Sequence, residues 1–95
     1  MTRIHIATDG SGRTEIECRG HAGKAEVCAG IGTLVCSMAG WAHEHGGDVR
    51  EERGDGHMRL SFTGCGEVAQ FVASALYSLA AKHPENVQLD ANNFV

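Results

Sequence analysis

Residues 20–34, GHAGKAEVCAGIGTL, join a glycine-bounded turn to the start of a long apolar segment. The turn holds His21, and Cys28 follows seven residues later at the expected beginning of a helix. The first N–H groups of a helix lack acceptors within it, and its dipole favours negative charge there. A cysteine at such a position tends toward a lowered pKa, and an imidazole within reach can take its proton. This pattern indicates a reactive thiol; a small, inert, buried cysteine is the alternative.

The segment after the turn has the spacing of a helix. Its apolar residues recur at intervals of three, four and seven, which places them on one face; they are Val27, Ile31, Leu34, Val35, Met38 and Trp41. At about 100° per residue, Cys28 lies at the rim of this face and Cys36 on the opposite side. We expect the helix to end by Gly46-Gly47. Trp41 is expected in the core or at a subunit interface, as is Tyr77.

Two strands are predicted ahead of the turn. Residues 2–8 and 13–19 both alternate between apolar and polar side chains, which is typical of half-buried strands. The segment between them, Asp9-Gly10-Ser11-Gly12, is a strong turn signal. We therefore expect a hairpin, with Ile16 and Cys18 on its buried face.

A second group of elements follows the first helix. Residues 48–54 are highly charged, as in an exposed edge strand. Asp55-Gly56 is a hairpin signal, and residues 57–62 alternate. Residues 68–80 form an amphipathic helix that Pro84 terminates, and residues 87–89 can add a short strand. The order is strand-strand-helix-strand-strand-helix-strand, which predicts one α+β domain over residues 1–95, with two helices on an antiparallel sheet in two layers.

Composition narrows the possible functions. The net charge of −4 argues against direct nucleic-acid binding. No signal peptide is apparent, and no stretch is expected to span a bilayer. Four cysteines without a secretory context indicate free thiols in the cytoplasm rather than a disulfide framework. No cofactor is expected.

A metal site is the chief rival chemistry. Cys18, His21, Cys28 and Cys36 could supply three sulfurs and one imidazole. The spacing has no close Cys-x-x-Cys pair, and Cys36 points away from Cys28 on the helix. We therefore predict no metal, and keep a Cys/His metal-binding domain as a minor alternative.

The two motifs together resemble the ribosomal-processing cysteine protease family, Prp. Its members carry a Gly-His-Ala turn, as at residues 20–22, and a Val-Cys-Ala helix start, as at residues 27–29. The order of elements is similar over nearly the whole chain, and residues 83–87, HPENV, are similar to an aromatic-Pro-Glu segment in relatives.

The resemblance implies a homodimeric cysteine endopeptidase that removes the N-terminal extension of large-subunit ribosomal protein twenty-seven or cleaves another peptide. It assigns Cys28 as nucleophile and His21 as general base. The backbone N–H groups of Cys28 and Ala29 are candidate oxyanion donors. The substrate peptide is expected to lie extended over the turn and the glycine-rich helix start, with contacts to Gly20, Ala22, Gly23, Ala29 and Gly30.

The sequence departs from the family between the histidine and the cysteine. The loop is shorter by about five residues, and Ala25 stands where relatives have an aspartate three residues before the cysteine; seven extended residues still span up to roughly 23 Å. Glu26 is the nearest acid. A second alignment matches Cys36 to the family cysteine but loses the helix-start position. A binding or assembly module without catalysis, keeping the family fold with a truncated loop, is the alternative function.

Overall fold

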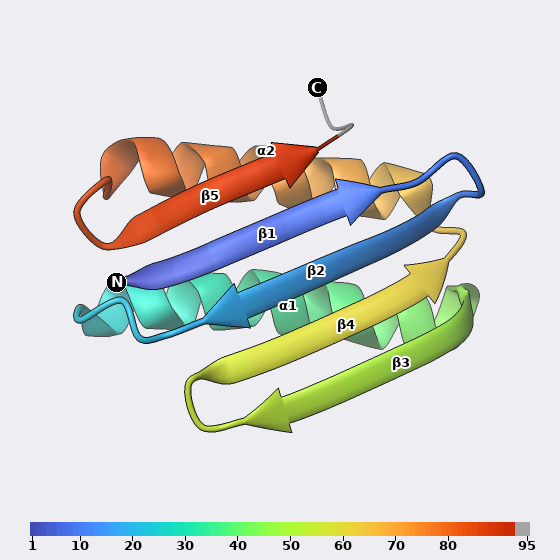
Figure 1. The fold of residues 1–95 in the computed structure, drawn as a ribbon, viewed down its shortest axis with the longest axis horizontal. Coiled ribbons are helices and arrows are strands. Elements are labelled where there is room, and N and C mark those ends of the chain that lie inside the picture. Colours follow the sequence, from blue (N-terminus) through green and yellow to red (C-terminus); the bar gives the residue numbers. More distant parts are fainter. Residues whose placement is uncertain (93–95) are drawn as a thin grey trace.

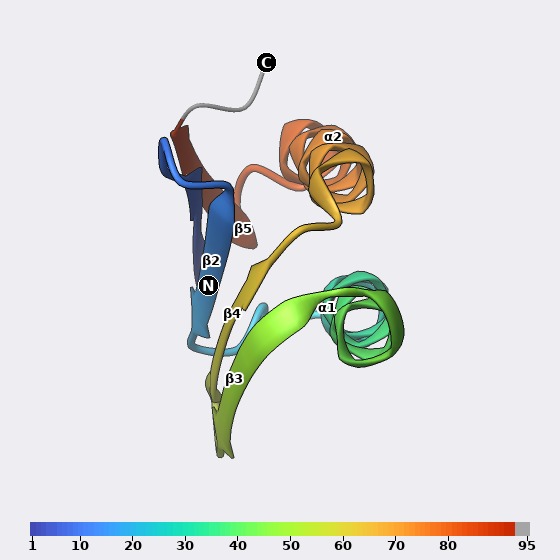
Figure 2. The same ribbon diagram turned by 90° about the vertical axis from the view of Figure 1, so that its right-hand side faces the viewer.

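Two helices lie on one face of a five-stranded sheet in the computed structural model, which describes residues 1–92 (Figures 1 and 2). The elements follow the expected order, and the α+β class is confirmed. Their bounds are β1 (Thr2–Thr8), β2 (Arg13–Arg19), α1 (Ala25–His45), β3 (Gly47–Gly54), β4 (His57–Thr63), α2 (Gly66–Lys82) and β5 (Val87–Asn92).

The sheet is mixed, with strand order β3-β4-β2-β1-β5. Neighbouring strands are antiparallel, except that β5 runs parallel to β1. The sequence prediction of an antiparallel sheet did not include this parallel pair. It arises because α2 carries the chain back across the sheet, so that β5 points the same way as β4 and β1 (Figure 1). The charged strand β3 is an edge strand, as expected.

The core lies between the inner face of the sheet and the helices. Apolar residues of the three central strands are in register: Ile6 lies opposite Ile16, which in turn lies opposite Leu60. These three side chains are almost fully buried, because strand alternation turns each of them toward the helices. The helices bury Val27, Ile31, Val35, Met38, Ala39 and Ala42 from α1, and Ala69, Val72, Ala73 and Leu76 from α2.

Three aromatic side chains lie outside this core. Trp41 is 47% exposed and stacks on His45 with ring centroids 4.1 Å apart. Tyr77 is 45% exposed, and Phe71 on α2 is 70% exposed. The core position considered for Trp41 and Tyr77 is therefore wrong, because other residues fill the buried side of each helix: Met38, Ala39 and Ala42 on α1, and Ala73 and Leu76 on α2.

Helix α1 is also more apolar than the sequence analysis recognised. Its length and composition would allow it to cross a membrane, with a mean hydropathy of 1.3. The expectation that no stretch is long enough is wrong on this point, because small apolar residues such as Ala29 and Cys36 occupy its outward face. Its inward face packs into the protein core.

Candidate functional site

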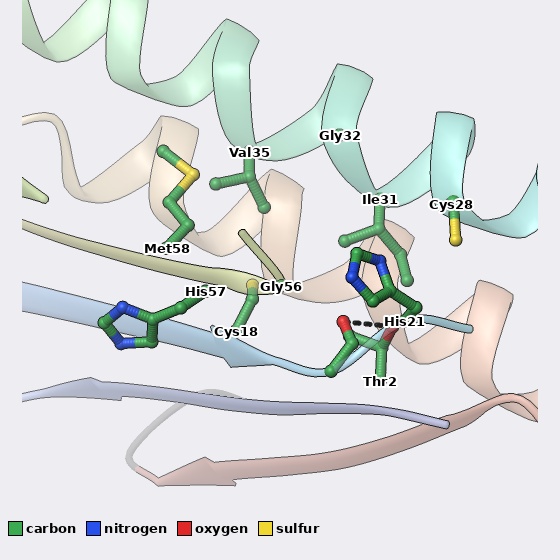
Figure 3. Close-up of a pocket in the computed structure, with 11 residues that line it drawn as sticks. Thr2, Cys18, His21, Cys28, Ile31, Gly32, Val35, Gly56, His57 and Met58 are labelled. Carbon is green, nitrogen blue, oxygen red and sulfur yellow. Dashed lines mark hydrogen bonds between the residues drawn. The ribbon is translucent and has the colours of Figure 1, made fainter. Parts of the chain in front are cut away.

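The motif residues meet at a pocket where β2 ends and α1 begins (Figure 3). The start of β1 and the turn between β3 and β4 lie at the same end of the sheet (Figure 1). His21 and Cys28 both line the pocket. The complete lining is Thr2, Cys18, Gly20, His21, Cys28, Ile31, Gly32, Val35, Gly56, His57 and Met58.

The His21 turn is held by contacts from three other segments. Gly20 has a φ of +88°, and its N–H donates to the Gly56 carbonyl at 2.8 Å. The Asn86 amide donates to the Ala22 carbonyl at 2.7 Å, and the Thr2 hydroxyl donates to the Gly20 carbonyl at 3.4 Å (Figure 3). The backbone around His21 is therefore fixed by β1, by the β3–β4 turn and by the loop before β5.

Cys28 sits one turn inside the helix rather than at its very start. Helix α1 begins at Ala25, and the Cys28 N–H donates to the Lys24 carbonyl at 3.1 Å. The sequence analysis placed the helix start three residues too late. The Cys28 sulfur is half-buried and accepts a hydrogen bond from the Ala22 N–H at 3.3 Å. The Ala22 N–H therefore points at the Cys28 sulfur and ties it to the His21 turn.

The His21 side chain lies at the solvent-exposed edge of the pocket. Its side chain is 67% exposed, and its Nε2 is 3.5 Å from an Asp55 carboxylate oxygen. The ring lies against Gly56, where an added Cβ would be 3.0 Å from Nε2. Figure 3 shows the imidazole between Gly56 and Ile31, on the side of the pocket that also holds Cys28. Within residues 1–92, no hydrogen bond joins His21 to Cys28.

The residues predicted to bind substrate divide into two groups. Gly20 lines the pocket, and the Ala22 N–H contacts the Cys28 sulfur; Gly23 is exposed in the turn with a φ of +79°. Ala29 is exposed on α1, and Gly30 faces Leu79 of α2 rather than the pocket.

The predicted oxyanion donors are engaged or internal to the helix. The Cys28 N–H is bound to Lys24, and Ala29 lies within the α1 hydrogen-bond ladder. This geometry leaves the Ala22 N–H as the backbone donor at the sulfur, a role that the sequence analysis did not assign to it.

The other cysteines differ from Cys28. Burial, with a smaller contribution from the Glu17 charge, raises the pKa of Cys18 to about 11. Cys36 is exposed, as expected of a residue turned away from the apolar face of α1, and its sulfur is 3.3 Å from an Arg53 guanidinium nitrogen. All four thiols are free. Among the described residues, no three His, Cys, Asp or Glu side chains are grouped to hold a metal ion.

Sequence analysis missed several pocket residues. Val35 and Met58 supply apolar lining, Gly32 rather than Gly30 faces the pocket, and Asp55 stands beside His21. The alternation of β4 and the helical period of α1 indicate which way Met58, Gly32 and Val35 face. It becomes useful only when the strand order is known, because β4 reaches the pocket as the neighbour of β2.

Comparison with known proteins gives matches at the level of structure. No protein-family model matches the sequence, and no curated protein is significantly similar to it. Among solved structures, the essential ribosomal processing protease Prp from S. aureus in complex with a covalently linked product peptide is 19% identical, with a TM-score of 0.77. The alignment covers 96% of this chain and 99% of that one.

Two further solved structures have a similar fold. The same S. aureus protease in complex with a substrate peptide is 16% identical, with a TM-score of 0.77. A hypothetical protein from Staphylococcus aureus is 13% identical, with a TM-score of 0.69; both alignments cover 96% of this chain and 99% of the other. The resemblance indicated by the two sequence motifs thus holds for the three-dimensional structure, and the chain has the fold of the ribosomal processing protease Prp.

Proposed function

We propose that this protein is a cysteine endopeptidase with Cys28 as nucleophile and His21 as general base. The observation that carries the proposal is the hydrogen bond from the Ala22 N–H to the Cys28 sulfur at 3.3 Å. This bond ties the helix cysteine to the residue that follows His21, inside a pocket that both functional side chains line. A thiolate held by a backbone donor beside an imidazole is the usual arrangement of an activated cysteine.

The chemistry follows from these groups. The imidazole takes the proton from the Cys28 sulfur, and a sulfur electron pair forms a bond to the carbonyl carbon of the scissile peptide. Collapse of the tetrahedral intermediate breaks the C–N bond, and the imidazolium returns the proton to the leaving amine. Water then hydrolyses the thioester, which releases the new carboxyl end and restores the thiol. In enzymes without substrate, nucleophile and base are often farther apart than in the reacting complex.

The structural relatives support a peptide as the proposed substrate class. S. aureus Prp is a ribosomal processing protease with structures in complex with substrate and product peptides. We infer that this chain binds an extended peptide in the pocket and removes the N-terminal extension of a ribosomal protein precursor, large-subunit protein twenty-seven being the first to test. The proposal includes a homodimer acting in the cytoplasm.

The test compares Cys28→Ala with Cys36→Ala. Peptides spanning the junction of the ribosomal precursor are incubated with each variant, and products are identified by mass spectrometry. Cys28→Ala should abolish cleavage, whereas Cys36→Ala should cleave as the parent protein does, because Cys36 is exposed and does not line the pocket. Cleavage by folded Cys28→Ala, or its loss only in Cys36→Ala, would contradict the proposal.

A non-catalytic binding module is the second candidate function. The absence of a His21–Cys28 hydrogen bond within residues 1–92 favours it. The two functions differ in the iodoacetamide alkylation of Cys28 as a function of pH. In a protease, Cys28 reacts below the range of a free cysteine, whose pKa is about 8.5, and His21→Ala slows the reaction. In a binding module, His21→Ala leaves the rate unchanged, while peptide binding persists.

A further inference from the structure

The turn between β3 and β4 forms a wall behind the His21 ring. Its Gly56 carbonyl accepts the Gly20 N–H at 2.8 Å, so this turn and the His21 turn are joined directly. Gly56 has a φ of +64°, and its Cα lies so close to the imidazole that an added Cβ would stand 3.0 Å from Nε2. Asp55 is the preceding residue, and its carboxylate is 3.5 Å from the same nitrogen.

Other charged groups near the site already have partners. Glu26, the acid nearest to Cys28 in the sequence, lies 3.8 Å from Lys24. His57, which also lines the pocket, is 3.4 Å from Glu17 on β2. Among the described residues, Asp55 is therefore the carboxylate paired with His21.

We propose that Asp55 is a positioning residue that orients His21 toward Cys28; this inference rests on the protease function proposed above. The negative charge of the carboxylate beside Nε2 favours the tautomer whose proton stays on Nε2, which leaves the Nδ1 electron pair to take the proton of the Cys28 thiol. Figure 3 shows the two ring nitrogens on different sides, one of them facing the Gly56 side and the other facing α1. When the thiol proton has moved to Nδ1, the imidazolium carries a positive charge that the Asp55 carboxylate stabilises.

Solvent exposure sets the size of this effect. The Asp55 side chain is fully exposed and that of His21 is 67% exposed, so water screens their interaction. Exposed ion pairs alter equilibria by about threefold to fivefold at most. We therefore expect a modest change in rate, far below the loss expected for removing His21 itself.

The test measures Cys28 alkylation and peptide cleavage in Asp55→Ala and Asp55→Asn. The matched control is Asp90→Ala, which removes the carboxylate of a second exposed pair, His5–Asp90 at 3.0 Å, on strands β1 and β5. At about pH 6, where a free thiol is almost wholly protonated, Asp55→Ala should slow alkylation about threefold to fivefold. Near pH 10 its rate should equal that of the parent protein, because the thiolate then forms without the imidazole.

Cleavage should report the same effect as a lower kcat with little change in KM, since Asp55 acts on the base and not on the peptide. Asp55→Asn keeps an acceptor for Nε2 but not the charge, and should fall between the parent protein and Asp55→Ala. Normal rates in Asp55→Ala, together with slow rates in His21→Ala, would overturn the role of Asp55 and leave the protease function standing. An unchanged alkylation rate in His21→Ala would overturn both.

Discussion

Gly20 is the residue on which the position of His21 depends most directly. Its φ of +88° lies in the left-handed region, where a side chain is strained. An added Cβ would also stand 2.5 Å from the Met1 carbonyl oxygen, which belongs to the backbone and cannot rotate away. Gly12 has a similar φ of +85° but has open space around it.

Alanine substitutions at Gly12 and Gly20 distinguish the cost of backbone strain alone from the added cost of a steric clash with the Met1 carbonyl. Gly12→Ala should lower the free energy of unfolding by about 1 kcal/mol, the usual penalty for a side chain in this backbone region. Gly20→Ala should lower it by about 3 kcal/mol and slow Cys28 alkylation, because the turn must also move away from β1. Urea unfolding and alkylation of both variants provide the check. Equal destabilisation of the two would show that the collision is relieved without consequence.

At the scale of elements, the loop before β5 supports the backbone of the His21 turn. The Asn86 side-chain amide donates to the Ala22 carbonyl at 2.7 Å, and the Asn86 backbone carbonyl accepts the Thr2 N–H at 2.9 Å. Only the first of these bonds uses the side chain. The loop therefore connects β1, β5 and the turn that precedes α1.

Removal of that side chain should loosen the turn while the strands stay paired. Asn86→Ala is expected to lower the free energy of unfolding by about 1 to 2 kcal/mol, because the partly buried Ala22 carbonyl loses its donor. Because Ala22 also donates to the Cys28 sulfur, cleavage should slow as well. Gln88→Ala, which removes an exposed amide from β5, is the control and should be close to neutral. Loss of activity in both variants would point to a general effect on β5.

The sequence predicts the individual elements better than it predicts how they pair. Alternation and helical spacing are local properties, so the strands, both helices and the rim position of Cys28 followed from them. The pairing of β5 with β1 depends on how α2 crosses the sheet. Asp55 was recognised as part of a hairpin turn, but its place beside His21 depends on the path of β3 and β4. Long-range contacts of this kind leave no local periodicity.

At the scale of the whole molecule, Cys18 links protonation to folding. It lies on β2, which has a neighbouring strand on each side, and it faces the core. Burial raises its pKa from 9.0 in the unfolded chain to about 11. The folded protein therefore holds the Cys18 proton over a range of pH in which the unfolded chain releases it.

This difference predicts a loss of stability at alkaline pH. The stabilisation is fully present below about pH 9 and is lost as the pH rises through about 11, because the unfolded chain then binds fewer protons than the folded one. The shift corresponds to about 2 to 3 kcal/mol. Urea unfolding of the parent protein and of Cys18→Ala should show a steeper decline between pH 9 and 11 for the parent, since other titrating groups are common to both. Parallel curves would mean that Cys18 ionises normally in the folded state.

The position of Met1 has a practical consequence for enzymology. Its carbonyl lies over Gly20, and Thr2 lines the pocket, so a peptide attached ahead of Met1 would begin next to the pocket that Cys28 also lines. An affinity tag fused there could occupy the pocket in cis and compete with added peptide. Kinetic assays on this protein should therefore use material from which an amino-terminal tag has been cleaved, with the tagged form measured alongside as a test for self-inhibition.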